Sequence, residues 1–296
     1  METSRYRAFA AAAETGSFSR AAEALHYSPS GVSQLISALE ADLGVTLLHR
    51  TSRGVSLAPA GEALLPAIRA LLQQEERVFQ LSSELNGLMT GELNIASYSS
   101  VSFRWLPKVI KAFQQDYPNI KLHLMEGISQ EVLQWLGDSR ADIGFLSSVK
   151  DCSYEWIPLS DDPMIAVLPK DHPYAKADVY PLAECEHERF IMPALGKDSD
   201  VVDLLERFHL NPTIIYSTIE SFSAFAMIEN GLGMTITNRL ITEGFQADVV
   251  KLPLDPPQHI QFGIMIPNKD AISPAARKFI DYAKKTMEQT SQTDRY

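Results

Sequence analysis

Apolar residues between positions 29 and 43 recur every three or four places, which predicts a helix with one buried face. Its buried side chains are expected to be Val32, Ile36, Leu39 and Leu43. Ser28-Pro29 suits the start of this helix, because serine accepts an unpaired N–H and proline lacks one. The opposite face carries only small hydrogen-bonding side chains, namely Ser30, Ser33, Gln34 and Ser37. A short helix with such a face fits the major groove of DNA.

A shorter helix over residues 21–25 precedes this one, and a small β-hairpin is expected after it. A break at His26-Tyr27 separates the two helices, as in a helix-turn-helix. Pairs of amphipathic helices that only pack together have the same periodicity, and spacing alone favours that simpler reading.

A set of matches at fixed spacing reverses that preference. The matching positions are Gly16-Ser17-Phe18, Ala21-Ala22, Leu25, Ser28, Val32-Ser33, Ile36, Leu39-Glu40, Leu43-Gly44, Leu47-Leu48, Arg50, Leu57 and Ala60-Gly61. This segment resembles the N-terminal domain of LysR-type transcriptional regulators. The resemblance implies a winged helix-turn-helix with 29–43 as recognition helix and 51–54 at the wing tip. We expect DNA contacts from Arg20, Ser28, Ser30, Ser33, Gln34, Ser37, Arg50 and Arg53.

A long helix is expected over residues 59–88. Apolar side chains recur along it every seven residues, at Leu64, Leu71, Val78 and Leu85. Such a repeat is typical of a seam between paired helices, although one helix lying on its own domain's core has a similar pattern. The family resemblance favours pairing between two chains, and therefore a homodimer or homotetramer.

From residue 91 onward, short apolar strands alternate with helices, and the β-α-β-α-β order of the first three strands indicates a parallel sheet covered by helices. The strands are expected at 92–96, 120–126, 141–148, 164–169, 189–193, 213–217, 234–237 and 259–267. The helices are expected at 102–116, 129–136, 200–208, 221–230 and 274–288, with a disordered tail over 289–296.

Three motifs in this region, Asp142-Ile143-Gly144, residues 168–173 and Gly231-Leu232-Gly233, are similar to the effector domain of the same family. The resemblance implies two α/β lobes of the type 2 periplasmic-binding-protein fold. The fold class is then α + α/β, with a winged helix over 1–58, a linker helix over 59–90 and an effector domain over 91–290. Lobe I is expected to span 91–162 and 266–290, and lobe II 163–265.

A ligand in such a fold is expected between the lobes, at the carboxyl ends of the strands. Hydroxyl groups gather there, although serine at a helix start serves equally as a cap. Candidate effector contacts are Ser97, Tyr98, Ser99, Ser100, Ser147, Ser148, Met192, Pro193, Ser217, Thr218, Ser221 and Phe222. Ser100 and Ser221 are expected to face solvent from opposite sides of the empty cleft. Asp198 and Asp200 near its mouth count against a strongly anionic effector.

Charge neither supports nor opposes DNA binding. The formal charge is −11, but residues 1–91 hold seven Arg, no Lys and nine acidic side chains, against 19 basic and 28 acidic ones beyond. With so few cations near the recognition helix, binding should depend on two copies in a dimer. The two cysteines, Cys152 and Cys185, do not have zinc-finger spacing and are expected to be inert thiols in a reducing compartment.

No segment resembles a signal peptide or membrane span, so we expect a cytoplasmic protein without membrane partners. The sequence offers no nucleophile-base pair, phosphate loop or metal cluster, so neither an enzyme nor a cofactor is expected. His172 and Asp142 are interpreted as structural residues. The prediction is a ligand-responsive transcriptional regulator whose partners are double-stranded DNA, a small-molecule effector, its own copy and RNA polymerase. The alternatives are a DNA-binding regulator with an empty cleft and a solute-binding module.

Overall fold

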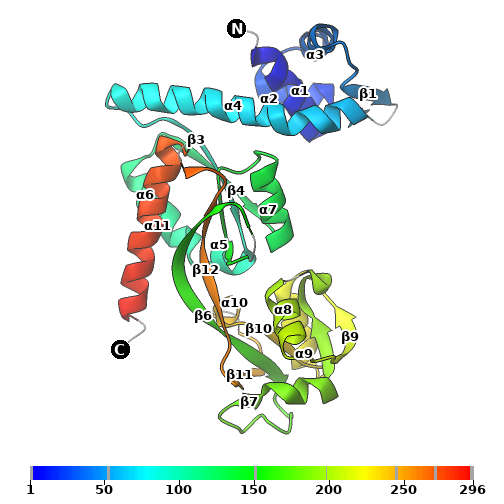
Figure 1. Ribbon diagram of the computed structural model, residues 1–296, viewed down its shortest axis with the longest axis vertical. Coiled ribbons are helices and arrows are strands. Elements are labelled where there is room, and N and C mark those ends of the chain that lie inside the picture. The colour runs from blue at the N-terminus through cyan, green and yellow to red at the C-terminus, as the bar shows by residue number, and fades with distance from the viewer. Residues whose placement is uncertain are drawn as a thin grey trace. The chain divides into compact units, whose positions relative to one another are not determined.

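The computed structural model describes residues 3–51, 54–149, 152–197, 199–243, 246–269 and 272–293 (Figure 1). Its chain divides into two compact units. Unit 1 comprises Met1–Gly91 with Gly137–Arg140, and unit 2 comprises Glu92–Leu136 with Ala141–Tyr296.

Unit 1 is a helical domain with a two-stranded hairpin, followed by a long helix. Its elements are α1 (Thr3–Thr15), α2 (Phe18–Leu25), α3 (Pro29–Leu43), β1 (Leu48–Thr51), β2 (Gly54–Leu57) and α4 (Pro59–Leu85). The predicted second helix has the predicted bounds, and the two hairpin strands pair antiparallel. The long helix ends at Leu85, three residues before the expected end.

Local hydrogen bonds and one shared core explain where α2 and α3 begin and end. Ser17 and Ser28 cap the two helices by accepting N–H groups of the first turn, and Gly44 ends α3 in the left-handed conformation. Val32, Ile36 and Leu39 join a core with α1, α2 and the start of α4, as predicted. Leu43 is exposed, contrary to prediction, because the contribution of α3 to this core stops at Leu39, one turn earlier.

The main sheet of unit 2 is curled and mixed, in the order β4 (Ile120–Glu126), β3 (Gly91–Ser97), β5 (Ile143–Ser147), β12 (His259–Ile266), β6 (Glu155–Pro169), β11 (Val249–Asp255) and β7 (Tyr180–Pro181). β10 (Thr235–Asn238) also pairs with β6, and β8 (Arg189–Met192) and β9 (Thr213–Ser217) form a separate two-stranded sheet. β3 (Gly91–Ser97) and β5 (Ile143–Ser147) are parallel, as predicted. β12 (His259–Ile266) is antiparallel to both β5 and β6 (Glu155–Pro169), so the sheet is mixed. The reason is that the chain returns from the second lobe in the opposite direction.

The long strands β6 and β12 connect two lobes (Figure 1). Lobe I holds β3, β5, β4 (Ile120–Glu126), α5 (Ser99–Arg104), α6 (Leu106–Asp116), α7 (Ser129–Gly137) and α11 (Pro274–Thr293). Lobe II holds β7 (Tyr180–Pro181), β8 (Arg189–Met192), α8 (Ser199–Arg207), β9 (Thr213–Ser217), α9 (Ser221–Glu229), β10 (Thr235–Asn238), α10 (Arg239–Thr242) and β11 (Val249–Asp255).

Several elements of unit 2 differ from those predicted. Residues 102–116, predicted as one helix, belong to two helices that break at Trp105, and the first begins earlier, at Ser99. The sequence patterns did not predict β7, β11 or α10, and the strand expected at 164–169 covers less than half of β6. The final helix continues to Thr293, five residues into the segment expected to be disordered.

Candidate functional sites

The polar face of α3 is exposed over most of its length. Ser30, Gln34 and Ser37 are exposed, and Ser33 is half-buried. Ser28 uses its hydroxyl to cap the helix, accepting from Gly31 N at 3.0 Å, and lies 3.0 Å from the Ser30 hydroxyl. The face therefore presents hydrogen-bonding groups of the size that reaches base edges in a major groove.

Arg50 connects the hairpin to this face. Its Nη2 donates to Ser33 Oγ at 2.7 Å, and its guanidinium carbon lies 5.0 Å from the centre of the Phe18 ring. These contacts hold an exposed cation beside the polar groups of α3. Arg20 is also exposed and donates to the Thr15 carbonyl, whereas Arg53 lies outside the described residues.

Sequence reasoning missed two residues that fix the hairpin against α3 and α4. Glu40 Oε1 accepts from Leu47 N at 2.7 Å and from Leu48 N at 3.2 Å. A side chain on Gly61 would collide with the Leu47 carbonyl oxygen, so only glycine allows this approach of α4. The Ala60-Gly61 pattern was a signal for this contact, whereas a single glutamate near a helix end was not.

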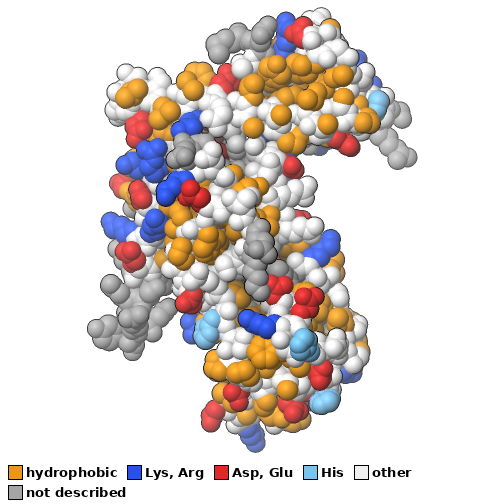
Figure 2. All heavy atoms as spheres, in the orientation of Figure 1, with side chains coloured by type: hydrophobic (Ala, Val, Ile, Leu, Met, Phe, Trp, Pro, Cys, Tyr) orange, Lys and Arg blue, Asp and Glu red, His pale blue; other side chains and the backbone are white. Residues whose placement is uncertain are grey.

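The predicted seam on α4 is only partly covered. Leu64 packs against the core of unit 1, whereas Leu71, Val78 and Leu85 have relative exposures of 43%, 65% and 88%. Phe79 and Leu88 are exposed as well. Apolar side chains are visible in Figure 2 over the region that α4 occupies in Figure 1. Such an apolar row is typical of an interaction surface.

Unit 2 contains a cavity of about 190 Å³ between the lobes, which we call the inter-lobe cavity. Lobe I contributes Ser99, Ser102, Phe103, Leu124 and Glu126, and lobe II contributes Glu220, Ser221, Phe222 and Ile241. The Ser102 hydroxyl is buried and has no hydrogen-bond partner among the described residues. Buried hydroxyl groups are generally hydrogen-bonded, so a water molecule or a ligand in the cavity is expected to pair with this one.

Three of the predicted effector contacts line this cavity, namely Ser99, Ser221 and Phe222. Ser97, Ser100 and Ser147 are instead buried. The expectation that Ser100 faces solvent is wrong, because Ser100 lies on the inner side of α5 and only 4% of it is exposed. Bulk added at Ser100 would overpack lobe I rather than fill the cavity.

The remaining predicted effector contacts lie elsewhere. Tyr98 is buried, and its hydroxyl accepts from Ser129 Oγ at 2.8 Å and donates to Asp200 at 3.4 Å. Met192 lines a more open cavity of about 560 Å³ beside α8, and Pro193 is buried next to it. Ser148, Ser217 and Thr218 are not among the residues that line the inter-lobe cavity.

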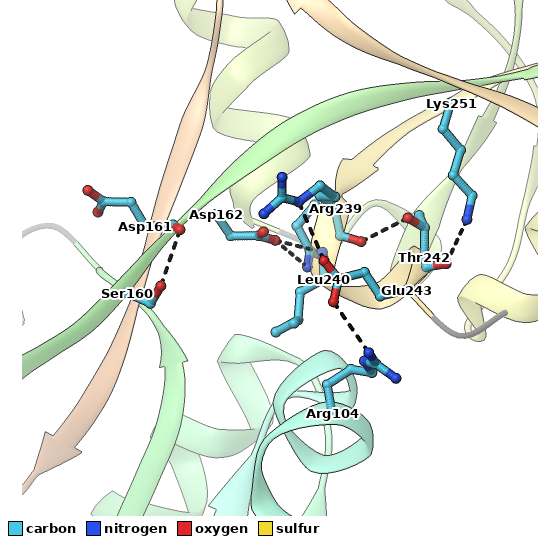
Figure 3. A network of polar contacts seen from close by, with 10 residues as sticks. Arg104, Ser160, Asp161, Asp162, Arg239, Leu240, Thr242, Glu243 and Lys251 are labelled. Atoms are coloured by element: carbon cyan, nitrogen blue, oxygen red, sulfur yellow. Dashed lines mark hydrogen bonds and ion pairs between the residues drawn. The ribbon is translucent and has the colours of Figure 1, made fainter. Parts of the chain in front are cut away.

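A polar network fixes the lobe II wall of the inter-lobe cavity to the connecting strand β6 (Figure 3). Asp162 on β6 accepts from Leu240 N at 2.9 Å and from Asn238 Nδ2 at 3.0 Å. It thereby acts as a remote cap for α10, because the side chain of the helix's own N-cap residue, Asn238, does not cap the first turn. Burial raises the pKa of the Asp162 carboxyl above its usual value.

The same network connects the lobes directly. Arg104 of α5 lies 3.4 Å from Glu243, which follows α10 and also pairs with Arg239 at 3.5 Å (Figure 3). The partly exposed ion pair between Arg104 and Glu243 is the kind that contributes up to about 1 kcal/mol. It therefore holds the lobes together only weakly.

Asp142 and His172 make the structural contacts expected of them. Asp142 accepts from Asn94 N at 2.7 Å, next to the start of β5. His172 accepts from Tyr174 N through Nδ1 at 3.2 Å, so its other ring nitrogen carries the proton that it shares with Glu188 at 2.9 Å.

The two cysteines are free. Cys185 is fully buried in the core of lobe II, and burial raises the pKa of its thiol to about 11. A thiol with this pKa is almost fully protonated at neutral pH, which makes it a poor nucleophile.

Metal-binding clusters and membrane-spanning helices are both absent from the described residues. Those residues contain no group of three or more His, Cys, Asp or Glu side chains that could hold a metal ion. None of their helices combines the length and apolar character needed to cross a bilayer.

Two family models match the chain and together cover most of it. The model described as "Bacterial regulatory helix-turn-helix protein, lysR family" matches residues 3–62. The model described as "LysR substrate binding domain" matches residues 86–288. The second match alone covers more than half of the chain.

Curated relatives and solved structures agree with both matches. The chain is 33% identical to the uncharacterized HTH-type transcriptional regulator YvbU of Bacillus subtilis, over 96% of this chain and 98% of that protein. A full-length single-site variant of OxyR from Pseudomonas aeruginosa is similar with a TM-score of 0.77 and 19% identity, over 97% of both chains. Full-length CbnR complexed with its target DNA is similar with a TM-score of 0.67 and 22% identity, over 97% of this chain and all of that one.

Proposed function

Because the chain belongs to the LysR family of bacterial transcriptional regulators, we propose that it binds operator DNA and that a small molecule modulates this binding. α3 enters the major groove, and the β1–β2 hairpin is the wing. The observation that carries the proposal is the exposed, capped polar face of α3 with Arg50 fixed beside it at 2.7 Å. CbnR, whose structure contains DNA, is similar over nearly the whole chain.

Different residues supply base recognition and phosphate binding in this proposal. Ser30, Gln34 and Ser37 contact base edges, because their side chains are exposed and carry donors and acceptors. Arg20 and Arg50 bind the DNA backbone. Two cations per copy give little non-specific affinity, so one copy alone binds weakly.

Pairing of two copies through α4 supplies the missing affinity. The exposed row of Leu71, Val78 and Leu85 is apolar, and burying each side chain contributes about 1.5–3 kcal/mol. A dimer formed in this way presents two recognition helices to two half-sites. Dimers can associate further into a tetramer, and RNA polymerase is the partner that would read the outcome.

The inter-lobe cavity is the effector site in this proposal. It draws residues from both lobes, so a bound molecule changes the relative stability of their arrangements. The domains then divide as 1–58 for DNA binding, 59–90 for dimerisation and 91–290 for effector binding. The chain acts in the cytoplasm by binding, without catalysis or a cofactor.

A DNA selection experiment tests this proposal. The full chain would be used to select duplexes from a random library, and the affinity for the enriched sequence would be measured at two salt concentrations. The triple variant Ser30→Ala, Gln34→Ala, Ser37→Ala should lose the enriched sequence preference while remaining folded. Gln115→Ala, which changes an exposed helix glutamine in unit 2, should behave like the wild type. Enrichment of the same sequence by the triple variant would contradict the proposed recognition helix.

A further inference from the structure

The inter-lobe cavity carries two carboxylates and no balancing cation. Glu126 ends β4 in lobe I, and Glu220 precedes α9 in lobe II. Neither side chain makes a hydrogen bond or ion pair within the described part of the chain. None of the described residues that line the cavity is Lys or Arg. The cavity therefore presents net negative charge to whatever enters it.

The charged groups around the cavity do not reverse this sign. Arg104 belongs to the same helix as Ser102, but its guanidinium pairs with Glu243 at 3.4 Å and does not line the cavity. The positive end of α9 already has Glu220 at its N-cap position. A ligand carboxylate at this helix end would have to approach that carboxylate.

Two aromatic rings, one from each lobe, contact each other edge-to-face in this cavity. Phe103 of lobe I and Phe222 of lobe II have ring centroids 5.8 Å apart with an interplanar angle of 70°. Aromatic faces attract cations, and the attraction is strongest where water is excluded. Leu124 and Ile241 add apolar wall, which favours a ligand with an uncharged portion as well.

Ser102 is a second, independent sign of a ligand. Only 7% of this residue is exposed, it lines the cavity, and its hydroxyl has no hydrogen-bond partner among the described residues. Leaving a buried hydroxyl unpaired is costly, and a ligand N–H group would satisfy it as an acceptor.

We propose that the effector of this cavity is an organic ammonium ion: a positively charged nitrogen bound by Glu126 and Glu220, with an apolar group packed against the contacting rings of Phe103 and Phe222. This identification of the ligand class rests on the proposed function of the cavity as an effector site. A cavity of about 150 Å³ holds a benzene molecule. The inter-lobe cavity, at about 190 Å³, has room for one ring with a short ammonium arm.

Calorimetric titration of the full chain with three matched probes tests the ligand class. The probes are 2-phenylethylammonium, neutral 2-phenylethanol and anionic phenylacetate, at pH 7 and constant ionic strength. The ammonium should bind saturably and at least about fivefold more tightly than either of the others. Glu126→Gln and Glu220→Gln should each weaken it by up to about fivefold, because an exposed charge pair contributes up to about 1 kcal/mol.

The variants also have a matched control and a test of the hydroxyl. Ser102→Ala should weaken binding of the ammonium probe more than binding of the alcohol probe. Glu206→Gln, which removes an exposed carboxylate from the other cavity, should bind the ammonium like the wild type. Tighter binding of phenylacetate, unchanged ammonium binding in the Glu126→Gln, Glu220→Gln double variant, or no saturable ammonium binding would each overturn the proposal.

Parallel measurement of DNA affinity separates this proposal from the proposed function. If phenylacetate binds in the cavity and shifts DNA affinity, the protein is a ligand-controlled regulator and the ammonium class is wrong. If the ammonium binds through Glu126 and Glu220 but DNA affinity does not change, the ligand class holds and control of DNA binding by this cavity is wrong.

Discussion

Asp162 offers the sharpest test of how the inter-lobe cavity is held in shape. Its carboxylate is 5% exposed and accepts two hydrogen bonds, from the Leu240 backbone and the Asn238 side chain. Asp162→Ala removes both bonds and leaves a buried N–H at the start of α10 without its acceptor. The loss of a helix cap costs about 1 kcal/mol, and because its donor is left buried and unpaired the cost lies in the range ~1–3 kcal/mol. Part of this is offset by the removal of a buried charge, so we expect a net loss of about 2 kcal/mol.

For a domain of this size, each kcal/mol lowers Tm by roughly 2–4 °C, so Asp162→Ala should unfold about 4–8 °C below the wild type. Tryptophan fluorescence reports the right unit, because all three tryptophans, Trp105, Trp135 and Trp156, lie beyond residue 91. Asp161→Ala is a matched control, since this neighbouring aspartate is exposed. Equal melting temperatures for the two variants would refute the remote cap.

The conservative variant Asp162→Asn separates charge from hydrogen bonding. Asparagine keeps an oxygen acceptor for both donors, so this variant should lose far less stability than Asp162→Ala. Because burial raises the pKa of Asp162 in the folded state, the folded chain binds its proton more readily than the unfolded chain. Wild-type stability relative to Asp162→Asn should therefore be greatest below about pH 4 and fall as the pH rises through the folded pKa. The opposite trend in urea unfolding would refute the assigned burial effect.

Other predictions concern DNA, assembly and oxidation. Gln34→Ala should lower the DNA-binding free energy by about 1–3 kcal/mol through one base position. Arg50→Ala should weaken binding to all DNA sequences alike and reduce the slope of log affinity against log salt concentration by about one. The same footprint and salt slope in both variants would refute these roles. Leu71→Asp with Val78→Asp should produce monomers in sedimentation and weaken DNA binding, because charges in an apolar seam cost several kcal/mol each; a dimer that persists would place the seam elsewhere. Cys185, whose thiol pKa is raised by burial to about 11, should resist alkylation in the folded chain at pH 7, as mass spectrometry would detect; rapid labelling would contradict its burial.

In unit 1, α3, the hairpin and α4 could be predicted closely because local interactions determine them, whereas α1 was not predicted and α2 begins three residues before its expected start. Ser28, Pro29 and Gly44 mark both ends of α3 through caps that involve only neighbouring residues. The 3-4 periodicity identified Val32, Ile36 and Leu39 as core residues. The prediction that Leu43 is buried failed because periodicity indicates which face of a helix is apolar, but not where the elements packed against that face end.

Elements in unit 2 that depend on distant contacts were missed. α10 has four residues and is capped by Asp162, which precedes Leu240 by 78 positions. β11 alternates buried and exposed residues only over its last five positions, and it pairs with β6 across at least eighty residues. Neither element carries a strong local signal, so contacts with β6 determine both: a side-chain cap for α10 and strand pairing for β11.

The inter-lobe cavity shows how one local error propagates to a functional site. The helix was expected near 102–116 with Ser99 or Ser100 as its start, and no pattern in the sequence grouped Ser99 with Ser102 and Phe103. The helix begins at Ser99, and positions three and four residues later lie on the same face, which is the face that lines the cavity. Ser100 then points inward, as its burial confirms. Glu126 and Glu220 are 94 positions apart, and only the crossing of β6 and β12 brings their two lobes together. The serines were visible as helix starts, but the sign of the charge around them depends on this tertiary contact.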